Sequence, residues 1–576
     1  MEKRERKKKV QDFIDELGLA GLLVSVDGQS PCNAIMDSYT NTGEDSKTDA
    51  LVKGVTYNSL EVEKDFLFVC KGVHFKEEYL EDAIKKGAVC YVREGKAAAC
   101  CASDNKLIET ANQEIEKTNQ ATEIKKQAIE ITNQATERKE QAIEIISQTT
   151  ETTNLAIEII VSDIRKAMPI IAKTFYGDLS EELKIVGVTG TKGKSTTAYF
   201  MRYILDDYMA GVGGKKSAIC SGIDNYDGVI EEESHLTSPE IMELYMHMNN
   251  AIESGIDYMT MEVSSQALKY DRVEGIEFEA GAFLNIGTDH ISPIEHPDFD
   301  DYFEAKLRLF AHCRKACYSL DSEGQERIKA AAADCPIVIT FSQKDEAANI
   351  FGYDVKSNEG RVSFRARGCD IPDCDDFDEE FALGTFGTIN IENALAAISM
   401  SALSGIPMEY IRSGLSKAKS PGRMEVFYSK DGGRIAIVDY AHNKLSYERF
   451  FETIKDEFPG KKMIIVFGCP GMKALARREE LGTLAGRNCA HSIITEEDYG
   501  EEDVNKICNE IAVHVAKTGG SYEIITDRVE AVKKAITLMD DDTILFLPGK
   551  GRETREKRGN AYIDTPSDVE VVEEYL

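Results

Sequence analysis

The segment GVTGTKGKSTT, residues 187–197, combines closely spaced glycines with a lysine and several hydroxyl side chains. It lies between an apolar predicted strand and a predicted helix. Glycines in such a turn let backbone N–H groups close around phosphate oxygens, and the helix N-terminus attracts the same anion. Lys194 would reach the terminal phosphates, and the Ser195 hydroxyl would bind Mg²⁺. A turn without a ligand is disfavoured by the G-K-S-T sequence. The segment predicts ATP binding by Gly190, Thr191, Lys192, Gly193, Lys194, Ser195 and Thr196.

Two further predicted strands end in side chains that suit a metal site. The apolar strand 258–263 carries Glu262 near its end, and the next strand, 280–286, leads into NIGTDH and His290. Open α/β sheets bind ligands at the carboxyl ends of their strands. Each residue alone could equally be a solvated carboxylate or part of a helix cap. Together with the phosphate loop, Glu262 favours a Mg²⁺ site that includes Ser195.

The elements that must position these residues are strands and helices in alternation. The chain has 576 residues, and a single core stops growing near about 250–300, so about three domains are expected. The alternation is typical of parallel α/β units, and Pro421-Gly422 marks a joint. We predict an α/β protein with domains at 1–181, 182–422 and 423–576.

Composition excludes several classes of protein. With 42% hydrophobic and 29% charged residues, the sequence is that of a globular protein. The net charge of −33 disfavours binding to nucleic acid or to anionic membranes. No apolar run reaches the length of about 20 residues that spans a bilayer, and the charged N-terminus does not resemble a secretory signal. These features predict a cytoplasmic protein whose 14 cysteines are reduced.

A repeat interrupts the first domain at about 104–155. From Thr118 it recurs every 14 residues as TNQATEIKKQAIEI and close variants, which is two heptads per copy. Alanine and isoleucine form one stripe of a polar helix. A helical hairpin, a self-associating arm or a partly disordered loop would each return the chain to its strand. An expanded repeat without chemistry is the simpler interpretation, and a coiled-coil docking arm for a partner is the functional alternative.

The phosphate loop departs from the ordinary spacing, because the glycine before Gly193 lies three residues earlier instead of five. This form resembles the Mur ligase family, the ATP-dependent amide-forming enzymes of peptidoglycan precursor synthesis. The resemblance is strongest to the branch that adds the third amino acid. It implies an N-terminal UDP-binding domain, a central ATPase domain and a C-terminal Rossmann-like domain.

The resemblance also implies roles for individual residues. Lys306 in YFEAKLRLF matches A-K-x-x-L-F, whose lysine is carbamoylated by CO₂ and joins Ser195, Glu262 and His290 at the metal. Spacing alone would place Lys306 on a helix surface. Nucleotide contacts are implied for Asn390, Asn393, Arg423 and Asp439. UDP-MurNAc-dipeptide contacts are implied for Ser59, Thr237, Ser238, Ser264 and Arg272. Contacts to the incoming amino acid are implied for Arg478, Glu497, Asp498, Gly549 and Glu553.

The sequence departs from the family pattern at three substrate positions. Gln266 replaces a histidine, Tyr270 replaces a glutamine, and the D-N-P-R element is EDYG at 497–500, with Gly500 in place of its arginine. That arginine grips the far carboxylate of meso-diaminopimelate, so its loss disfavours this amino acid. Glu497 and Asp498 would suit lysine or ornithine, although surface acids are common in so acidic a chain.

The reaction implied is transfer of the ATP γ-phosphoryl to the γ- or α-carboxylate of D-glutamate in UDP-MurNAc-L-Ala-D-Glu. A free amino acid then attacks the acyl phosphate. One alternative is a ligase for another acceptor, as in folylpolyglutamate or cyanophycin synthetases. The other is a degenerate nucleotide-binding paralogue that acts as a scaffold through its repeat.

Overall fold

The computed structural model describes residues 6–27, 47–72, 75–95, 156–292, 295–358 and 361–576. The predicted repeat at 104–155 lies outside them. The chain packs as two compact units. The first comprises residues 1–181, 239–249 and 270–276, and the second comprises the remainder. Two short segments distant in sequence therefore belong with the N-terminal part of the chain.

The first unit is built on a five-stranded sheet with the order β2-β7-β6-β5-β4. Only β2 is antiparallel to its neighbour. The strands are β2 (Leu23–Val26), β4 (Gly54–Thr56), β5 (Phe66–Val69), β6 (Cys90–Glu94) and β7 (Ile157–Val161). The helices are α1 (Val10–Leu19), α3 (Glu77–Lys85) and α6 (Ile164–Tyr176). β1 (Lys8–Lys9) and β3 (Leu51–Val52) form a separate short pair, and a 3₁₀ turn covers Lys47–Asp49.

The second unit contains an 11-stranded sheet with the order β11-β10-β9-β12-β8-β13-β14-β15-β16-β17-β18. Its middle, from β9 to β16, is parallel. The strands are β8 (Lys184–Thr189), β9 (Ala218–Cys220), β10 (Asp224–Tyr226), β11 (Glu231–Glu233), β12 (Tyr258–Glu262), β13 (Ala280–Phe283), β14 (Lys315–Ser319), β15 (Ile337–Ser342), β16 (Ile350–Asn358), β17 (Arg361–Gly368) and β18 (Phe377–Ala382). β12 and β13 are buried along their whole length, as expected for strands covered on both faces.

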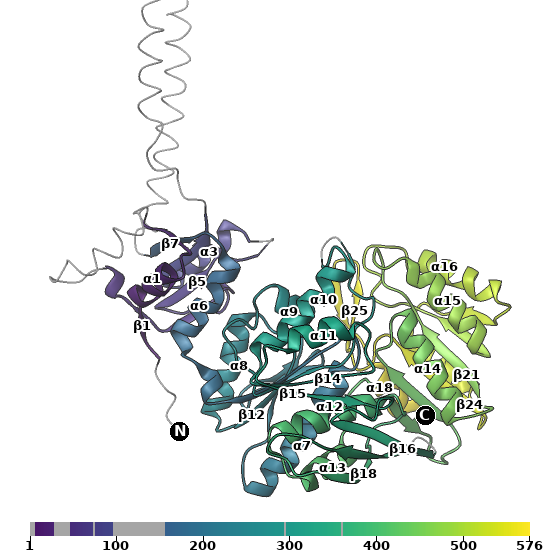
Figure 1. Ribbon diagram of the computed structural model, residues 1–576. Helices are drawn as coiled ribbons and strands as arrows, with labels where there is room; N and C mark the ends of the chain where they lie inside the picture. The colour runs from purple at the N-terminus through teal and green to yellow at the C-terminus, as the bar shows by residue number, and fades with distance from the viewer. Residues whose placement is uncertain (1–5, 28–46, 73–74, 96–155, 293–294, 359–360) are drawn as a thin grey trace, which may run out of the picture. The chain divides into compact units, whose positions relative to one another are not determined.

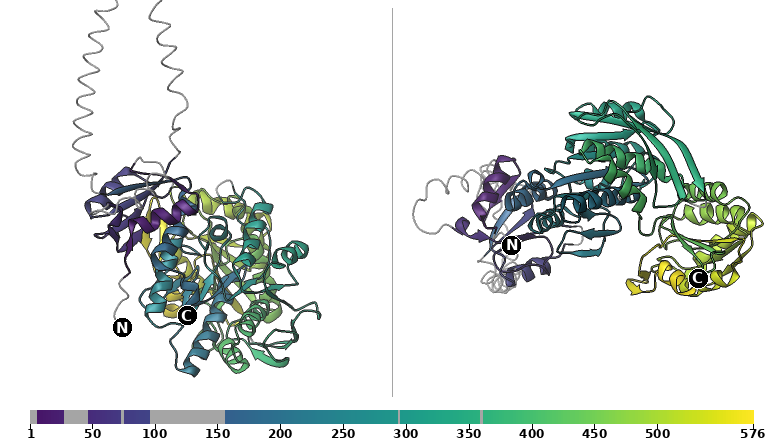
Figure 2. Two further views of the ribbon diagram at one scale, coloured as in Figure 1. Left: turned by 60° about the vertical axis from the view of Figure 1, so that its left-hand side comes forward. Right: turned by 90° about the horizontal axis from the view of Figure 1, so that it is seen from below.

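Helices cover this sheet, and Figures 1 and 2 show α7, α12 and α13 packed beside it. They are α7 (Lys194–Val212), α9 (Ser265–Lys269), α10 (Phe299–Leu307), α11 (Gln325–Ala332), α12 (Asn390–Leu403) and α13 (Met408–Lys417). Most of α8 (Ile241–Glu253) belongs to the first unit. Apolar side chains of α7 and α12 form one core with β8, β13 and the later strands. Almost every side chain of α12 is buried, so this helix holds the sheet in place behind the phosphate loop.

A second sheet of six strands follows, with the order β19-β20-β24-β21-β22-β23. β19 is an antiparallel edge strand, and the others are parallel. The strands are β19 (Glu425–Tyr428), β20 (Ile435–Asp439), β21 (Lys462–Phe467), β22 (His491–Ile494), β23 (Tyr522–Ile524) and β24 (Thr543–Pro548). The helices are α14 (Lys444–Glu457), α15 (Ala476–Asn488), α16 (Val504–Lys517), α17 (Arg528–Leu538) and α18 (Asp568–Tyr575). One apolar core packs with α14, α15 and α16 and another with α17 and α18. A hairpin, β25 (Arg555–Arg558) and β26 (Ala561–Asp564), precedes α18.

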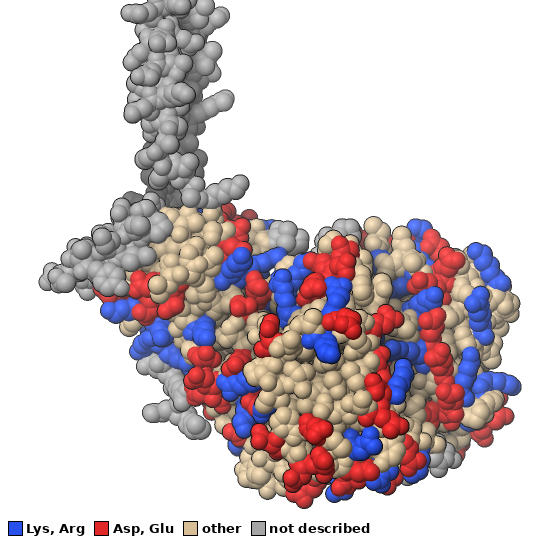
Figure 3. Space-filling model, viewed as in Figure 1, with Lys and Arg blue, Asp and Glu red and all other residues tan. Residues whose placement is uncertain are grey.

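The face drawn in Figure 3 carries both signs of charge, with acidic and basic side chains interspersed. Among the described helices, none is long and apolar enough to cross a membrane.

Candidate active site

The phosphate loop follows β8 and leads into α7, as the sequence predicts. Gly190 and Gly193 have φ angles of 158° and 89°. A Cβ atom at Gly193 would lie 2.1 Å from Oδ1 of Asn393, so only glycine fits this turn. Thr191, Ser195 and Thr196 are buried around it. The loop therefore has the close backbone curvature that a phosphate group needs.

Two lysines that are far apart in the sequence lie against this loop. Lys194 Nζ is 3.0 Å from the carbonyl oxygen of Gly190, and Lys306 Nζ is 2.9 Å from the same oxygen. Lys306 is only 1% exposed. Burial lowers the pKa of both amines. The Lys194 ammonium lowers the pKa of Lys306 further, and Lys192 and Arg423 oppose the charge on Lys194. Lys306 is thus no surface lysine but a buried amine at the phosphate site.

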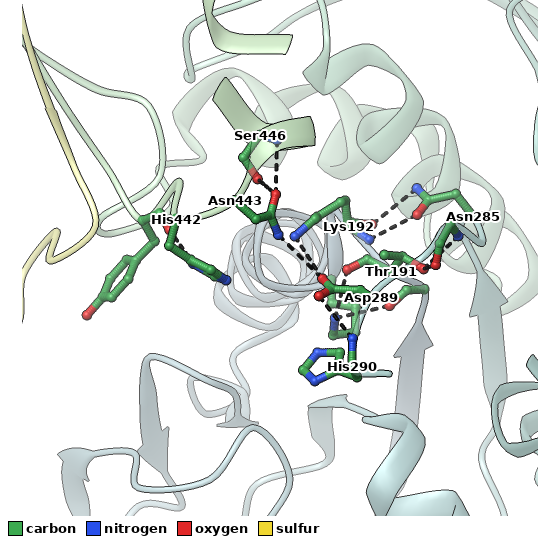
Figure 4. A network of polar contacts seen from close by, with 12 residues as sticks. Thr191, Lys192, Asn285, Asp289, His290, His442, Asn443 and Ser446 are labelled. Carbon is green, nitrogen blue, oxygen red and sulfur yellow. Dashed lines mark hydrogen bonds and ion pairs between the residues drawn. The ribbon is translucent and has the colours of Figure 1, made fainter. Parts of the chain in front are cut away.

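The side-chain amide of Asn285, which the sequence analysis did not select, holds the tip of the loop by hydrogen bonds. Asn285 accepts a hydrogen bond from the Lys192 backbone N–H at 2.9 Å and donates one to the Lys192 carbonyl at 3.2 Å. Figure 4 shows this amide facing the loop, with Asp289 on the other side of Lys192. Asp289 forms an ion pair with Lys192 Nζ at 3.1 Å. Burial opposes ionisation, but Lys192 and His290 lower the pKa of Asp289 to about 2. Asn285 begins the NIGTDH motif, which was the signal for it.

Two of the predicted metal ligands, Glu262 and His290, lie at or beyond the ends of the strands on either side of β8, which are β12 and β13. Glu262 ends β12, is 1% exposed, and accepts a hydrogen bond from the Gly222 N–H at 2.8 Å. His290 has a left-handed φ of 57°, and its Nδ1 lies 3.4 Å from Glu295 Oε1. Burial lowers the pKa of His290, which favours the neutral ring that metals bind.

The residues present fit a magnesium ion bound together with phosphate. Among the described residues no three His, Cys, Asp or Glu side chains form a metal cage. Mg²⁺ commonly uses one or two carboxylates and completes its shell with substrate phosphates and water. A buried Glu262, the Ser195 hydroxyl and a phosphate loop supply that kind of donor set.

A cavity of about 130 Å³ lies beside the loop. Asn390 and Asn393, for which the sequence analysis predicts nucleotide contacts, line it. Asn390 donates to the Phe386 carbonyl at 2.7 Å and accepts from the Asn393 amide at 3.0 Å. Much of the hydrogen-bonding capacity of Asn390 is therefore used internally, and Asn393 is the better placed of the two to contact a ligand. Other lining side chains that the sequence analysis missed are Glu392, Ser446, Arg449, Phe450 and Thr453.

The joint at 421–424 brings Arg423 to the phosphate loop. Its Nη2 lies 3.4 Å from Ser195 Oγ, and its guanidinium lies 4.8 Å from the centre of the Tyr440 ring. Asp439 holds the joint, because it accepts hydrogen bonds from the backbone N–H groups of Met424 and Ala441 at 2.8 and 2.7 Å. Burial raises the pKa of Asp439. The predicted nucleotide residues Arg423 and Asp439 are thus linked to each other and to Ser195.

His442, two residues beyond Tyr440, is another group that the sequence analysis did not select. Its Nδ1 lies 2.8 Å from the Tyr440 carbonyl oxygen. Burial and the nearby Lys192, Arg477 and Arg423 lower its pKa to about 3, so the ring is neutral. Such a concentration of positive charge is what an anionic substrate requires. Figure 4 shows His442 and Asn443 on the side of the loop opposite Asn285, and the Asn443 amide lies 3.5 Å from Asp289 Oδ2.

The residues predicted to contact the acceptor fall into both units. In the second unit, Ser238 Oγ lies 3.2 Å from Ser264 Oγ and donates to the Glu262 carbonyl at 2.8 Å. Thr237 lies near the same carboxylate, because a Cβ at Gly222 would be 3.5 Å from Thr237 Oγ1 and 3.7 Å from Glu262 Oε1. The acceptor residues of this unit therefore adjoin the proposed metal ligand.

In the first unit, Ser59 is buried and its carbonyl accepts a hydrogen bond from Lys86 at 2.7 Å. Arg272 pairs with Glu240 at 2.8 Å, and Lys71 pairs with the same carboxylate. Tyr270, which replaces a glutamine, lies under the guanidinium of Arg165 at 4.2 Å. One pocket is lined by Lys71, Arg165, Glu240, Tyr270 and Arg272, and in it two cations, Lys71 and Arg272, pair with the carboxylate of Glu240.

Arg478, which was predicted to contact the amino acid, is buried among acids. It forms a two-pronged pair with Glu502 at 3.0 and 2.7 Å and also contacts Glu510 at 2.5 Å. Two carboxylates therefore neutralise this guanidinium, and the arrangement is that of a structural ion pair.

The other residues predicted at the amino-acid end share one acidic cluster. Lys550 contacts Glu553 at 2.7 Å and Asp498 at 3.2 Å. Burial raises the pKa of Glu553 and raises that of Glu497 to about 8. Gly549, with φ of 104°, lies against Glu497, since a Cβ there would be 2.5 Å from Oε2. Burial also raises the pKa of the neighbouring Glu556 to about 7. Carboxyl groups this reluctant to ionise favour a cationic ligand.

A glycine-rich loop between β8 and α7, with the amines of Lys194 and Lys306 against it and Glu262 at the end of β12, is the arrangement of an enzyme that uses ATP. Residues 188–401 match the description "Mur ligase middle domain", and residues 422–551 match "Mur ligase, glutamate ligase domain". The chain belongs to the Mur ligase family.

Relatives in this family cover most of the chain. It is 32% identical over 510 residues to a protein of Enterococcus faecalis named UDP-N-acetylmuramoyl-L-alanyl-D-glutamate–L-lysine ligase, covering 88% of each chain. It is 31% identical to a UDP-N-acetylmuramyl-tripeptide synthetase of Ligilactobacillus salivarius, covering 91% of this chain and 94% of the relative. These similarities confirm the family resemblance seen in the motifs.

Solved structures show the same fold. A structure of UDP-N-acetylmuramoyl-L-alanyl-D-glutamate–2,6-diaminopimelate ligase aligns with a TM-score of 0.57 at 20% identity, covering 94% of this chain and 98% of its own. MurF from Acinetobacter baumannii aligns with a TM-score of 0.56 at 16% identity, covering 99% and 98%. At these identities the likeness supports the α/β fold alone.

Proposed function

We propose that this enzyme adds the third amino acid to UDP-MurNAc-L-Ala-D-Glu and consumes one ATP. The observation that carries the proposal is the arrangement of Lys194, Glu262 and Lys306 around a phosphate loop in a Mur ligase fold. The acceptor follows from the names of the relatives, which share about nine-tenths of the chain. Use of ATP and a nucleotide-linked acceptor agrees with a reaction in the cytoplasm.

The chain's own residues would bind and orient both phosphates and acceptor. Backbone N–H groups of the loop and Lys194 hold the β- and γ-phosphates, and Ser195 and Glu262 hold Mg²⁺, with His290 beside them. Mg²⁺ supplies neutralisation of the phosphate charge. A carboxylate oxygen of the acceptor bonds to the γ-phosphorus as the bond to ADP breaks. The amine then bonds to the acyl carbon, phosphate leaves, and one proton is released.

Lys306 would enter this site as a carbamate. Its amine is buried, its pKa is far below the usual range, and it lies beside Lys194. A neutral amine attacks CO₂, a new N–C bond forms, one proton leaves Nζ, and the product carries a negative charge. That exchange converts repulsion between Lys194 and Lys306 into attraction. It would also supply an oxygen ligand near Glu262.

The acidic cluster around Glu497 favours an amino acid with a cationic side chain, such as lysine or ornithine. Asp498, Glu553 and Glu556 pair with Lys550, whereas burial raises the pKa of Glu497 to about 8 although Arg528, Lys550 and Arg477 lower it. Gly500 replaces the arginine that would bind a far carboxylate. Meso-diaminopimelate is therefore the poorer substrate.

The test is amino-acid-dependent release of ADP from ATP in the presence of UDP-MurNAc-L-Ala-D-Glu. We expect turnover with lysine or ornithine and much less with meso-diaminopimelate. A variant with Lys194→Ala is the matched inactive control. If ADP release requires another acceptor, such as a folate or a growing polypeptide, the assignment of the acceptor is wrong. If nucleotide binds but no amino acid supports turnover, the scaffold alternative holds.

A further inference from the structure

Three side chains that contact one another in a row, each buried or half-buried, join two parts of the second unit beside its 11-stranded sheet. His296 is fully buried; its Nε2 lies 2.9 Å from Ser265 Oγ, and its Nδ1 lies 2.6 Å from Asp301 Oδ2. Asp301 is held from the other side by Lys269 Nζ at 2.6 Å. None of these contacts belongs to the phosphate, metal or acceptor groups described above.

The two ends of this row of side chains lie close in sequence to groups whose positions the proposed chemistry depends on. Ser265 stands three residues after Glu262 and begins α9. Asp301 lies in the first turn of α10, whose last turn carries Lys306. His296 therefore connects the strand end that carries the metal carboxylate to the helix that carries the proposed carbamate.

A second contact fixes the same helix to the phosphate loop. Tyr302 donates a hydrogen bond to Thr191 Oγ1 at 3.1 Å. Its ring lies edge-on to His296, with 5.2 Å between centroids, and Lys306 Nζ lies 4.9 Å from the ring centre. The His296 ring thus packs directly behind the tyrosine that supports Lys306.

A serine, a histidine and an aspartate in this order also occur in hydrolases, where the serine attacks a carbonyl. Here Ser265 is 4% exposed and His296 is 0% exposed, and both ring nitrogens of His296 lie within hydrogen-bond distance of protein groups. A buried, fully bonded imidazole of this kind fixes geometry, since leaving either partner unbonded would cost the desolvation of that group.

We propose that His296 is a positioning residue that fixes α10 relative to the end of β12, so that the Lys306 amine stays beside the phosphate loop and becomes carbamoylated. This inference rests on the proposed function, because it assumes that the carbamate of Lys306 is used. It assigns to His296 no contact with ATP, acceptor or amino acid. Replacement of His296 should therefore lower the occupancy of the carbamate and the rate of the reaction, and it should leave the affinity for substrates unchanged.

The experiment compares His296→Gln with Asp300→Asn in the full-length enzyme. Asp300 is the neighbour of Asp301 on α10 and pairs with Arg327 at the surface at 2.7 Å, so it is a matched control. Carbamate on Lys306 is measured by ¹³C NMR after equilibration with ¹³C-bicarbonate. Turnover is measured over a range of bicarbonate concentrations.

For His296→Gln we expect most of the carbamate signal to be lost and kcat to fall by at least about tenfold. A small misplacement of a group at a reacting centre lowers the rate by this much or more. KM for ATP and for the amino acid should stay within about twofold, since no binding group is changed. Added bicarbonate should restore part of the rate. Ser265→Ala, which removes one hydroxyl, should shift the same quantities less. Asp300→Asn should match the wild type.

Three outcomes separate the two proposals. A carbamate signal in His296→Gln and Ser265→Ala equal to that in Asp300→Asn overturns the positioning role. An active wild-type ligase without any carbamate signal overturns the carbamate and this inference together. A wild type that is carbamoylated but ligates no amino acid overturns the proposed function alone. If His296→Gln fails to fold, by circular dichroism, the Ser265→Ala result decides.

Discussion

Lys194 and Lys306 direct their amines to a single acceptor, the carbonyl oxygen of Gly190, at 3.0 and 2.9 Å. Two ammonium groups this close in a buried site repel each other strongly. Burial lowers the pKa of both amines. The carbamate proposed for Lys306 would replace this repulsion with attraction.

Replacing Lys306 with alanine removes the group that would carry the carbamate. We expect kcat to fall by about a hundredfold, since an electrostatic stabiliser at a reacting centre is worth about that much. Short carboxylic acids such as formate should restore part of the rate by filling the same space. The measurement is ADP release with and without added formate. Rescue that is equal in wild type and variant would contradict the assignment.

Replacing Gly193 with alanine places a Cβ 2.1 Å from Asn393 Oδ1, in a backbone with φ of 89°. We expect nucleotide binding to be lost, because the loop must open to make room. Isothermal titration with ADP measures it. Gly213→Ala, at the other end of α7, is the control, since its φ is 78° but no atom lies within 4 Å of its Cβ. Equal loss in both variants would show that strain alone is responsible.

Binding of lysine should depend on the ionisation of Glu497, whose pKa burial raises to about 8. Below pH 8 the carboxyl is mostly protonated and attracts no cation, so affinity should rise with pH by up to about tenfold per unit. Binding should also release a proton, because the ligand's ammonium lowers this pKa. Titrations in buffers of different ionisation enthalpy measure the proton.

The control for this pH dependence is Glu501→Gln, because Glu501 is exposed and bonds Asn560. Glu497→Gln should bind lysine weakly with little dependence on pH between 6.5 and 8.5, whereas Glu501→Gln should behave as wild type. A Glu497→Gln enzyme that keeps the wild-type pH profile would assign the proton to another group.

Arg423 contacts both Ser195 and the Tyr440 ring, so its replacement by lysine should weaken the binding of the nucleotide rather than that of the amino acid. A lysine keeps the charge but loses the planar stacking. We expect KM for ATP to rise by about fivefold to tenfold, since a contact of this kind is worth about 1 kcal/mol. Steady-state kinetics measure it. Arg434→Lys, whose guanidinium bonds the terminal carbonyl of Leu576 at 3.4 Å, is the control.

The sequence alone determined the local elements of the site. The glycine spacing of the phosphate loop, the carboxylate that ends β12 and the alternation of strands and helices are encoded over a few residues each, because hydrogen bonding and side-chain periodicity are local. For that reason the predicted strand at 258–263 and the turn at 190–193 agree with the structure. The family followed from motifs that lie in the same order along the chain.

Only the tertiary structure decided which of these residues meet. The burial of Lys306 depends on a contact with Gly190 across 116 positions, and no periodicity of α10 reveals it. The pairing of Arg478 with Glu502, the clamp of Asn285 and the chain through His296 are of the same kind. Each places a charged or polar group where water is excluded, and the partners that compensate it are brought together only when the strands assemble into their sheets.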